Sequence, residues 1–476
     1  MDSSPAEASS ALVVGGGISG LLSARELDAA GYRVTVLEES DAWGGCVGSH
    51  TVAGINLDSG AESFATRSDA VASLAAELGL DANIVPPRPG GAWVQLPEGP
   101  RELPKTGVLG IPANPWDPEV RRSLGLFGAL RASADRFLPA SVGAGTDVTS
   151  VAALVRARMG KRVLERLVAP VVGGVHSADP GMLDVDMVAP GLRAGMRREG
   201  SLAAAVSAQR RGKAGAPAKA GSAVAGLKGG MHTLIDALVA DLAARGVKLL
   251  TGTRAESADR TSGGWRVTAG QTTYSAAVLV VATDGPAAVD LLAPTVPGIA
   301  GKKPGTGPDV KLVTLVISNA ALDSRPRGTG VLVAPQTPGI GAKALTHATG
   351  KWEWLREAAG DRHVVRLSYG RADGDGAPEK RHNGPETDAE LLAAALHDAS
   401  ALLEVPIRRS DVVDWDVVRW RGALPFAAVG HRARVASIRQ ACSATGALAV
   451  VGGWVAGNGL AAVVSDTRTQ LQNLLP

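Results

Sequence analysis

The first ordered stretch of the chain combines a strand pattern with a helix pattern. Residues 11–14 (ALVV) are uniformly apolar and end in β-branched side chains, which is typical of a buried parallel strand. Residues 18–30 place Ile and Leu at helical spacing among good helix formers, and Gly31 follows as a helix stop. Residues 32–40 alternate and are β-branched, so they predict a second strand. The chain therefore opens with a strand, a turn, a helix and a strand.

Two later segments repeat this order. Residues 274–292 predict an apolar strand followed by a turn and a helix. Residues 446–475 predict a strand, a glycine loop and a helix that runs from about residue 461 to residue 475. Strands of this kind can return to the first sheet after a long excursion. The pattern indicates an α/β fold whose main sheet is assembled from separate parts of the chain.

The middle of the chain has a different pattern. Residues 122–137 and 150–170 have amphipathic helical spacing, so the region from about 111 to 200 is predicted to be rich in helices. Residues 207–225 are small, basic and rich in Gly and Ala, which predicts a mobile loop. Residues 373–388 predict another exposed loop.

Composition narrows the class of protein. The 476 residues favour two or three domains, and 45% hydrophobic with 20% charged residues is ordinary for a globular protein. A net charge of +3 gives no indication of nucleic-acid binding. Cys46 and Cys442 lack the spacing of a metal site or a disulfide framework. No apolar run reaches the ~18–20 residues that a membrane-spanning helix requires. Residues 1–10 have no apolar segment, so we expect a frayed tail and not a signal peptide. We expect a cytoplasmic protein, with contact to a membrane surface not indicated.

The turn after the first strand carries a dinucleotide-binding pattern. Gly15, Gly17 and Gly20 form G-x-G-x-x-G between strand and helix. The three glycines permit the tight turn, the approach of the backbone to a pyrophosphate and the close packing of helix on strand. The pyrophosphate would lie at the positive end of the helix. Glu38 ends the second strand and can accept hydrogen bonds from a ribose diol, which disfavours a 2′-phosphate.

Additional loops favour FAD over a nicotinamide cofactor. Gly44 and Gly45 form a second glycine pair, and residues 60–63 (GAES) follow a further polar stretch. FAD is long and binds extended, so a flavoprotein needs more loops than a nicotinamide dehydrogenase. The pair E-x(5)-GG resembles the second fingerprint of glutathione-reductase-like flavoproteins of the amine-oxidase branch. Their usual Arg before the glycines is Ala42 here, so that contact is missing or comes from elsewhere.

From end to end, the chain resembles the protoporphyrinogen/coproporphyrinogen oxidases, which are FAD-dependent tetrapyrrole oxidases of haem synthesis. The middle segments are more specific than the glycine fingerprint, which generic amine oxidases share. The matching segments are 15–21, 57–80, 102–112, 167–186, 227–242 and the C-terminal GGWVAGNGL at 452–460.

The resemblance implies a discontinuous, Rossmann-like FAD-binding domain of the glutathione-reductase type, an α+β substrate domain and a helical insertion. We expect the FAD domain at residues 1–65, 226–292 and 430–476, the substrate domain at 85–110 and 293–429, and the helical domain at 111–200. The implied cofactor-binding residues are Gly15, Gly16, Gly17, Ile18, Ser19, Gly20, Glu38, Glu39, Gly45, Cys46, Gly60, Ala61, Glu62, Ser63, Ala255, Asn458, Gly459 and Leu460.

The implied reaction removes six electrons from a porphyrinogen in three rounds, each passing a hydride to the flavin and releasing a pyrrole proton, with O2 as acceptor and H2O2 as product. From the resemblance, we expect coproporphyrinogen III as the substrate. The alternatives are protoporphyrinogen IX, a different amine-oxidase-like flavoenzyme or a carotenoid desaturase, and an FAD-binding scaffold without turnover. The resemblance allows a partner enzyme of the haem pathway, and a nucleic-acid partner is not expected.

Single side chains remain weaker candidates, and no catalytic residue is assigned. His176 and His232 lie in family-like segments, where a structural role is commoner than proton transfer. Tryptophans could stack on a tetrapyrrole or flavin but more often pack in a core, and cations could meet the substrate's propionates. The candidates of these two kinds are Trp43, Trp93, Trp420 and Trp454, and Arg67, Arg101, Lys105 and Lys228.

Overall fold

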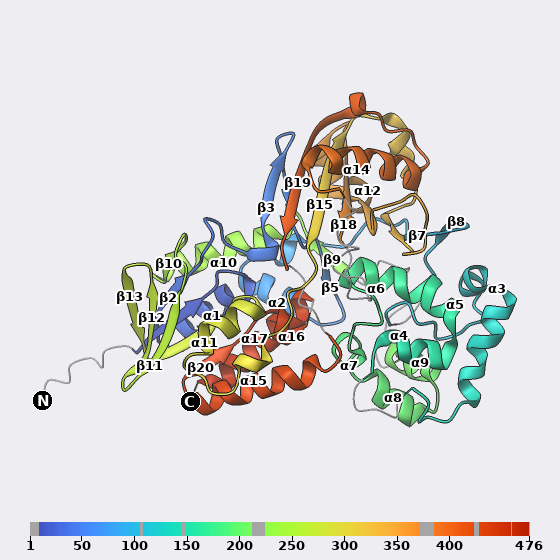
Figure 1. The fold of residues 1–476 in the computed structure, drawn as a ribbon. Helices are drawn as coiled ribbons and strands as arrows, with labels where there is room; N and C mark the ends of the chain where they lie inside the picture. The colour runs from blue at the N-terminus through green and yellow to red at the C-terminus, as the bar shows by residue number, and fades with distance from the viewer. Residues whose placement is uncertain are drawn as a thin grey trace, which may run out of the picture.

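The computed structural model shows a mixed α/β protein with three parts (Figure 1). One part contains a parallel sheet and the first and last described elements, β1 and α17, a second contains a larger antiparallel sheet, and a third is helical. The structure describes residues 9–104, 108–143, 149–211, 224–370, 385–422, 428–457 and 459–475.

The parallel sheet joins strands from distant parts of the chain. Its order is β10-β2-β1-β14-β20, and every neighbouring pair is parallel. Central β1 is buried along almost its whole length because it lies between two other strands and under helices, which explains its uniformly apolar sequence. The strands are β1 (Ser10–Val14), β2 (Arg33–Leu37), β10 (Lys248–Leu250), β14 (Val278–Val281) and β20 (Leu448–Val450).

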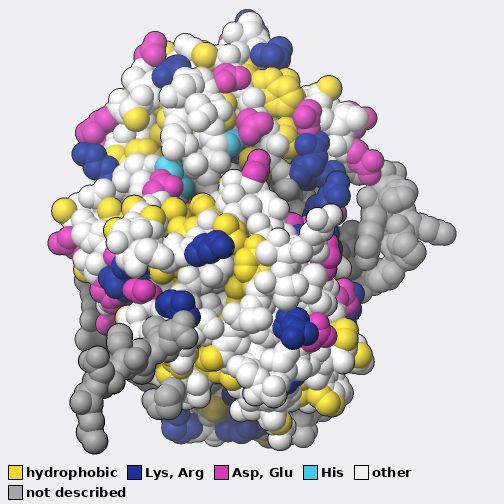
Figure 2. Space-filling model, turned by 90° about the vertical axis from the view of Figure 1, so that its left-hand side faces the viewer, with side chains coloured by type: hydrophobic (Ala, Val, Ile, Leu, Met, Phe, Trp, Pro, Cys, Tyr) yellow, Lys and Arg dark blue, Asp and Glu magenta, His cyan; other side chains and the backbone are white. Residues whose placement is uncertain are grey.

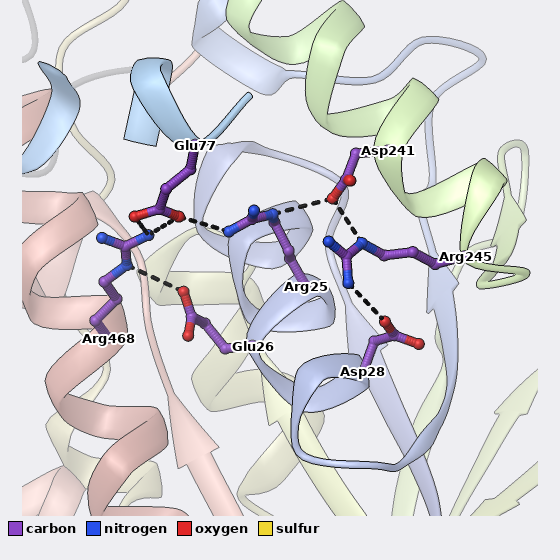
Figure 3. Close-up of polar contacts among 7 residues, drawn as sticks. All are labelled: Arg25, Glu26, Asp28, Glu77, Asp241, Arg245 and Arg468. Atoms are coloured by element: carbon purple, nitrogen blue, oxygen red, sulfur yellow. Dashed lines mark hydrogen bonds and ion pairs between the residues drawn. The ribbon is translucent and has the colours of Figure 1, made fainter. Parts of the chain in front are cut away.

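Four helices lie together beside this sheet and are connected by ion pairs (Figure 3). Arg25 of α1 contacts Glu77 at 2.6 Å and Asp241 at 3.0 Å, and Arg468 contacts Glu26 at 3.0 Å and Glu77 at 2.7 Å. Below them is a continuous apolar core. The helices are α1 (Ile18–Ala29), α2 (Ala70–Glu77), α10 (His232–Ala244) and α17 (Leu460–Leu474).

A second apolar core contains residues of the sheet, a three-stranded antiparallel sheet and three helices. Its elements outside the parallel sheet are β11 (Ser257–Thr261), β12 (Gly264–Ala269), β13 (Thr272–Ala276), α11 (Gly285–Leu292), α15 (His431–Thr445) and α16 (Gly453–Ala456). The end of the molecule shown in Figure 2 has basic and acidic side chains interspersed over its visible surface. This face therefore presents no continuous surface of one charge sign.

The antiparallel part is a seven-stranded sheet of order β19-β15-β18-β17-β16-β7-β8, in which only β16 and β7 run parallel. Helix α14 (Asp388–Leu403) packs on it and begins with a capping box between Thr387 and Glu390. The strands are β7 (Trp93–Leu96), β8 (Gly99–Glu102), β15 (Val310–Ile317), β16 (Gly330–Val333), β17 (Ala344–His347), β18 (His363–Tyr369) and β19 (Val412–Trp420).

The helical part has its own apolar core and one buried ion pair. The Nε of Arg158 donates to Asp135 at 2.6 Å, and both side chains are at most 1% exposed. The π-helix Leu164–Val168 leads directly into α6 (Ala169–His176), which packs on β16. The other helices are α3 (Pro118–Ser133), α4 (Val151–Met159), α5 (Lys161–Val163), α7 (Val185–Val188), α8 (Leu192–Glu199) and α9 (Leu202–Arg211).

Small sheets and turns connect the three parts. Strand β9 (Val224–Leu227) pairs with both β5 (Phe64–Ala65) and β6 (Ile84–Val85), and β3 (Ser49–Val52) forms a hairpin with β4 (Ile55–Asp58). The remaining short helices are η1 (Gly45–Val47), η2 (Asp81–Asn83), η3 (Ala134–Phe137), η5 (Ala300–Lys302), η6 (Ala320–Ser324), η8 (Arg409–Asp411), α12 (Ala348–Lys351) and α13 (Glu353–Ala359).

The structure corrects the predicted loop at 207–225. Residues up to Arg211 continue α9, and Val224 begins β9, so both ends of the segment belong to regular elements. The helical region consequently extends beyond residue 200. The single strand predicted from residue 274 onward is two strands in the structure. Its first residues belong to β13, and only Val278–Val281 form β14 of the parallel sheet. Residues 212–223, and most of the predicted loop at 373–388, lie outside the described residues.

Candidate active site

The glycine turn after β1 depends on the absence of side chains. Gly15 has φ +108°, and a Cβ there would lie 2.7 Å from the carbonyl oxygen of Ala282. A Cβ on Gly20 would lie 1.8 Å from the carbonyl oxygen of Gly15. The turn is thus compressed between β14 and the first turn of α1, as the fingerprint predicts.

The first turn of α1 fits an anionic group. The N-cap residue of α1 is Gly17, which has no side chain to cap the helix, and the described first turn carries no acidic residue. Its N–H groups and the helix dipole are therefore directed at the space beyond the turn. Ile18, Ser19 and Gly20 form this first turn, and all three are buried.

Glu38 lies beside the same turn. Its carboxylate accepts a hydrogen bond from the N–H of Gly16 at 2.5 Å and from the N–H of Ser40 at 2.9 Å. The segment before β11 runs alongside, since the N–H of Thr253 donates to the carbonyl of Glu38 at 2.7 Å. This brings Ala255 to the same end of the sheet, whereas Glu39 points outward to an exposed ion pair with Arg254.

The second and third loops pack against the first. The N–H of Gly44 donates to the carbonyl of Gly16 at 2.9 Å, and the N–H of Ala61 donates to the carbonyl of Cys46 at 2.9 Å. A Cβ on Gly60 would lie 2.1 Å from that same Cys46 oxygen. Gly45 begins the turn that carries Cys46. The loops at 15–20, 44–47 and 60–63 therefore form one cradle of closely packed backbone.

The C-terminal loop ends at a second helix N-terminus. Gly459 precedes α17, whose first residue is Leu460; in the described ranges, no side chain caps this helix and its first turn has no acid. A helix N-terminus favours negative charge, so this turn suits a group that carries or develops negative charge. Asn458 lies outside the described residues.

A charged cluster extends this cradle into the antiparallel sheet. Glu62 accepts a hydrogen bond from Nζ of Lys351 and lies 2.9 Å from Nη2 of Arg366. All three side chains are 14% exposed. Burial alone would raise the pKa of Glu62, but the charges of Lys351 and Arg366 and the lysine hydrogen bond outweigh it and lower the pKa to about 2. Glu62 is therefore ionised at neutral pH.

The sequence analysis included Glu62 but missed Lys351 and Arg366. Lys351 ends α12 and Arg366 lies on β18, so both come from the much later part of the chain that forms the antiparallel sheet. Lys351 is 289 residues from Glu62 in sequence. No local motif surrounds either cation, and only the three-dimensional fold brings them to the cradle.

The segment that precedes Glu62 is hydrogen-bonded to the antiparallel sheet. Nη1 of Arg366 donates to the carbonyls of Gly60 at 2.9 Å and Asp58 at 3.2 Å. The indole N–H of Trp420 donates to the carbonyl of Ser59 at 2.8 Å. These bonds fix the cradle relative to β18 and β19, and they place Trp420 at the junction of the two parts.

Asp58 and His232 have a structural role at the start of α10. The carboxylate of Asp58 accepts hydrogen bonds from the N–H groups of Met231 and His232, both at 3.0 Å, and so caps α10 from another element. Nδ1 of His232 lies 3.0 Å from the same carboxylate, and Nε2 lies 3.0 Å from the amide of Asn56. The hydrogen bond to Asp58 raises the pKa of His232. His232 therefore secures the helix start.

The other predicted side chains lie in several places. His176 ends α6, and burial lowers its pKa to about 4. Trp43 covers Gly16, Trp454 is buried under Gly285, and Trp93 lies on β7 under Arg327. Among the predicted cations, Arg67, Arg101 and Lys228 are exposed on separate segments, and Lys105 lies outside the described residues.

Comparisons with known proteins identify the family. The model of the flavin containing amine oxidoreductases matches residues 18–466. The coproporphyrinogen III oxidase of Mycobacterium leprae is 30% identical over 97% of both chains. That of Mycobacterium tuberculosis is 31% identical over 95% of this chain and 94% of the relative.

Solved structures agree in fold. A provisionally named protoporphyrinogen oxidase from Exiguobacterium sp. 255-15 superposes with a TM-score of 0.81 at 22% identity, covering 98% of this chain and 99% of that one. Cyclohexylamine oxidase from Brevibacterium oxydans gives 0.67 at 16% identity, covering 98% and 99%. The described helices include none that is both long and apolar enough to cross a bilayer. The chain is a flavin-dependent oxidoreductase that belongs to the flavin containing amine oxidoreductase family, in the branch of the coproporphyrinogen III oxidases.

Proposed function

We propose that the parallel sheet is a Rossmann-like domain that binds FAD through residues 1–65, 226–292 and 430–476. The start of α1, whose N-cap is Gly17, supports a pyrophosphate site there, and Glu38, which lies beside this turn, would accept hydrogen bonds from the adenosine ribose. The start of α17 would face the flavin pyrimidine. When bound, FAD supplies the acceptor for a hydride.

We further propose that the protein oxidises coproporphyrinogen III to coproporphyrin III. The observation that carries this proposal is the match to coproporphyrinogen III oxidases over 97% of both chains. Removing six electrons and six protons from the porphyrinogen reduces three O2 to three H2O2, so the reaction balances without another reactant. The region of 85–110 and 293–429 would hold the substrate, and 111–200 would form a helical domain beside it.

In this proposal the charged cluster positions the reactants. Glu62 holds Lys351 and Arg366 in fixed places before substrate arrives, so two partly desolvated cations lie next to the cradle without further ordering. Such cations suit a substrate that carries propionates. His176 is neutral at physiological pH because its pKa is lowered to about 4, so it does not act as a cationic acid there.

The test is aerobic turnover of coproporphyrinogen III and protoporphyrinogen IX, followed by porphyrin fluorescence and by H2O2 formation. We expect coproporphyrin III with H2O2 released in proportion, and a lower rate with protoporphyrinogen IX. Oxidation of a primary amine with neither porphyrinogen consumed would overturn the assignment. A flavin-loaded protein that porphyrinogen does not bleach without oxygen would indicate a scaffold.

Protoporphyrinogen IX is the second candidate substrate. Protoporphyrinogen oxidase 2 of Arabidopsis thaliana is 29% identical to this chain over 38% of the chain's length. This similarity supports protoporphyrinogen IX as the alternative substrate. The ratio of the two kcat/KM values decides between the two substrates.

A further inference from the structure

A basic cavity is lined in part by Thr349 and Gly350 of α12, the helix that ends at Lys351. It has a volume of about 250 Å³. Its described lining contains three guanidinium groups and one carboxylate, and two imidazoles complete the polar wall. That volume is below the roughly 300–1,000 Å³ of pockets for drug-sized ligands, so the cavity suits a small ion. The polar side chains are Arg88, Arg325, Arg356, Asp323, His347, His363 and Thr349.

Two of the guanidinium groups already have carboxylate partners. Arg88 contacts Glu353 at 2.8 Å, and Arg356 contacts Asp323 at 3.1 Å. Arg325 differs, because its Nη2 donates to the carbonyl of Pro89 at 2.5 Å, and its buried Nε has no hydrogen-bond partner among the described residues. Burial and the charge of Arg88 lower the pKa of Arg325, as expected for a cation that is poorly compensated.

The imidazoles add a second unsatisfied group. His347 is 0% exposed, its Nε2 lies 3.3 Å from Nδ1 of His363, and its Nδ1 has no hydrogen-bond partner within the described part of the chain. Nε2 of His363 lies 3.2 Å from Asp323 but outside hydrogen-bond geometry. A Cβ on Gly350 would lie 3.0 Å from Nδ1 of His347, so glycine keeps the space beside this nitrogen clear.

The histidines are neutral, which leaves the arginines to set the charge. Burial, followed by the charges of His363 and Arg325, lowers the pKa of His347 to about 3. Burial and Arg356 lower the pKa of His363, which Asp323 only partly opposes. A neutral imidazole nitrogen can accept a hydrogen bond or, in the other tautomer, donate one. The cavity therefore offers cationic donors together with a nitrogen that can meet a hydroxyl.

We propose that this cavity, formed by Arg325, Arg88, Arg356 and the unpartnered Nδ1 of His347, binds a phosphate group. Guanidinium forks match phosphate oxygens, and hydrogen phosphate also carries an O–H that can satisfy His347 in its accepting tautomer. A carboxylate at neutral pH has no such hydroxyl. The phosphate can be free inorganic phosphate or the terminal group of a small phosphomonoester. The guanidinium contacts are shared, and a monoester dianion, which has no O–H, would accept a hydrogen bond from His347 in its donating tautomer.

The test is calorimetric titration of the full-length, flavin-loaded protein with inorganic phosphate, glycerol phosphate and acetate at constant ionic strength. We expect saturable binding of at least one phosphate compound and none of acetate. Binding of both identifies a site that accepts phosphomonoesters, and binding of inorganic phosphate alone identifies the free ion; either supports the proposal. Acetate bound as tightly as phosphate, or no saturable binding, overturns it.

Two variants assign the binding to this cavity. Arg325→Gln is expected to weaken phosphate at least tenfold, and Gly350→Ala to weaken it by crowding His347. Arg409→Gln is the matched control, because Arg409 is exposed on the same part of the protein, and it should bind like the wild type. Flavin content and circular dichroism show that each variant is folded. Unchanged phosphate affinity in both folded cavity variants would overturn the proposal.

Discussion

The backbone cradle and the charged cluster meet at Glu62 but are built in opposite ways. The cradle at 15–20, 44–47 and 60–63 consists of neighbouring loops whose glycines let main chains touch. The cluster consists of side chains, and its two cations come from a part of the sequence that is far from Glu62. A site of the first kind is sensitive to added atoms, whereas a site of the second kind is sensitive to removed charges. The substitutions below test this difference.

The largest effect is expected from Gly20→Val. A Cβ at Gly20 would lie 1.8 Å from the carbonyl oxygen of Gly15, and the backbone cannot move away without opening the turn. We expect a protein that purifies without flavin and has no visible flavin absorbance. Gly263→Val is the control, since a Cβ there meets no described atom within 4 Å. A yellow Gly20→Val protein would contradict the role of the turn.

Lys351→Met should have the next largest effect. The change leaves Glu62 with one cation, and we expect kcat/KM for the porphyrinogen to fall about 10–100-fold, which corresponds to roughly 1.4–2.8 kcal/mol. Flavin content should stay close to that of the wild type. Lys161→Met is the matched control, because Lys161 pairs with Glu165 on the surface and its side chain is 73% exposed. Loss of flavin together with activity would show that the cluster belongs to the cradle.

Glu38→Gln should weaken FAD by about tenfold, or roughly 1.4 kcal/mol, because an amide oxygen is a poorer acceptor than a carboxylate. The N–H of Gly16 keeps an acceptor, so the turn should persist. Release of flavin into dilute buffer, followed by fluorescence, measures the change. Glu39→Gln removes the neighbouring carboxylate, whose pair with Arg254 is exposed, and should leave affinity unchanged. Equal effects of the two variants on FAD affinity would contradict a role of Glu38 in FAD binding.

The smallest effect concerns the ion pairs of Arg25, which join α1 to α2 and α10 (Figure 3). Arg25→Gln should cost about 1 kcal/mol at neutral pH, since both carboxylate partners are partly exposed. Burial opposes ionisation of Glu77 and Asp241, but hydrogen bonds from arginines outweigh it and lower both pKa values.

A lowered pKa stabilises the folded state above the unfolded pKa, and this contribution is lost as pH falls through the folded value. The cost of Arg25→Gln should therefore shrink in acid. Urea unfolding of both proteins at neutral and acidic pH measures it. A cost that grows on acidification would contradict the assigned ion pairs.

The cradle was largely predictable from sequence because its determinants are local. Gly15, Gly17, Gly20 and Glu38 lie within one strand–helix–strand unit, where glycine spacing and the terminal acid have a direct physical meaning. The return of β14 and β20 to the sheet was also predictable, since a fully buried parallel strand needs an uninterrupted apolar run.

The charged cluster and the basic cavity were not predictable in this way. Lys351 and Arg366 resemble any other surface cation in sequence, and only the pairing of β17 with β18 sets their positions relative to Glu62. Likewise, residues 207–211 look like a loop by composition, yet they continue α9 because its other face is buried in the helical core. In each of these examples, the local structure depends on packing partners that are distant in sequence.

The parallel sheet has a consequence for how the protein is made. Strand β1 ends at Val14, but β20, which borders β14 in the same sheet, begins at Leu448. A nascent chain therefore cannot complete the parallel sheet until nearly all of translation is finished. Premature stop codons anywhere before β20 should yield polypeptides that retain the fingerprint but cannot complete the sheet, and cellular proteases would be expected to clear them.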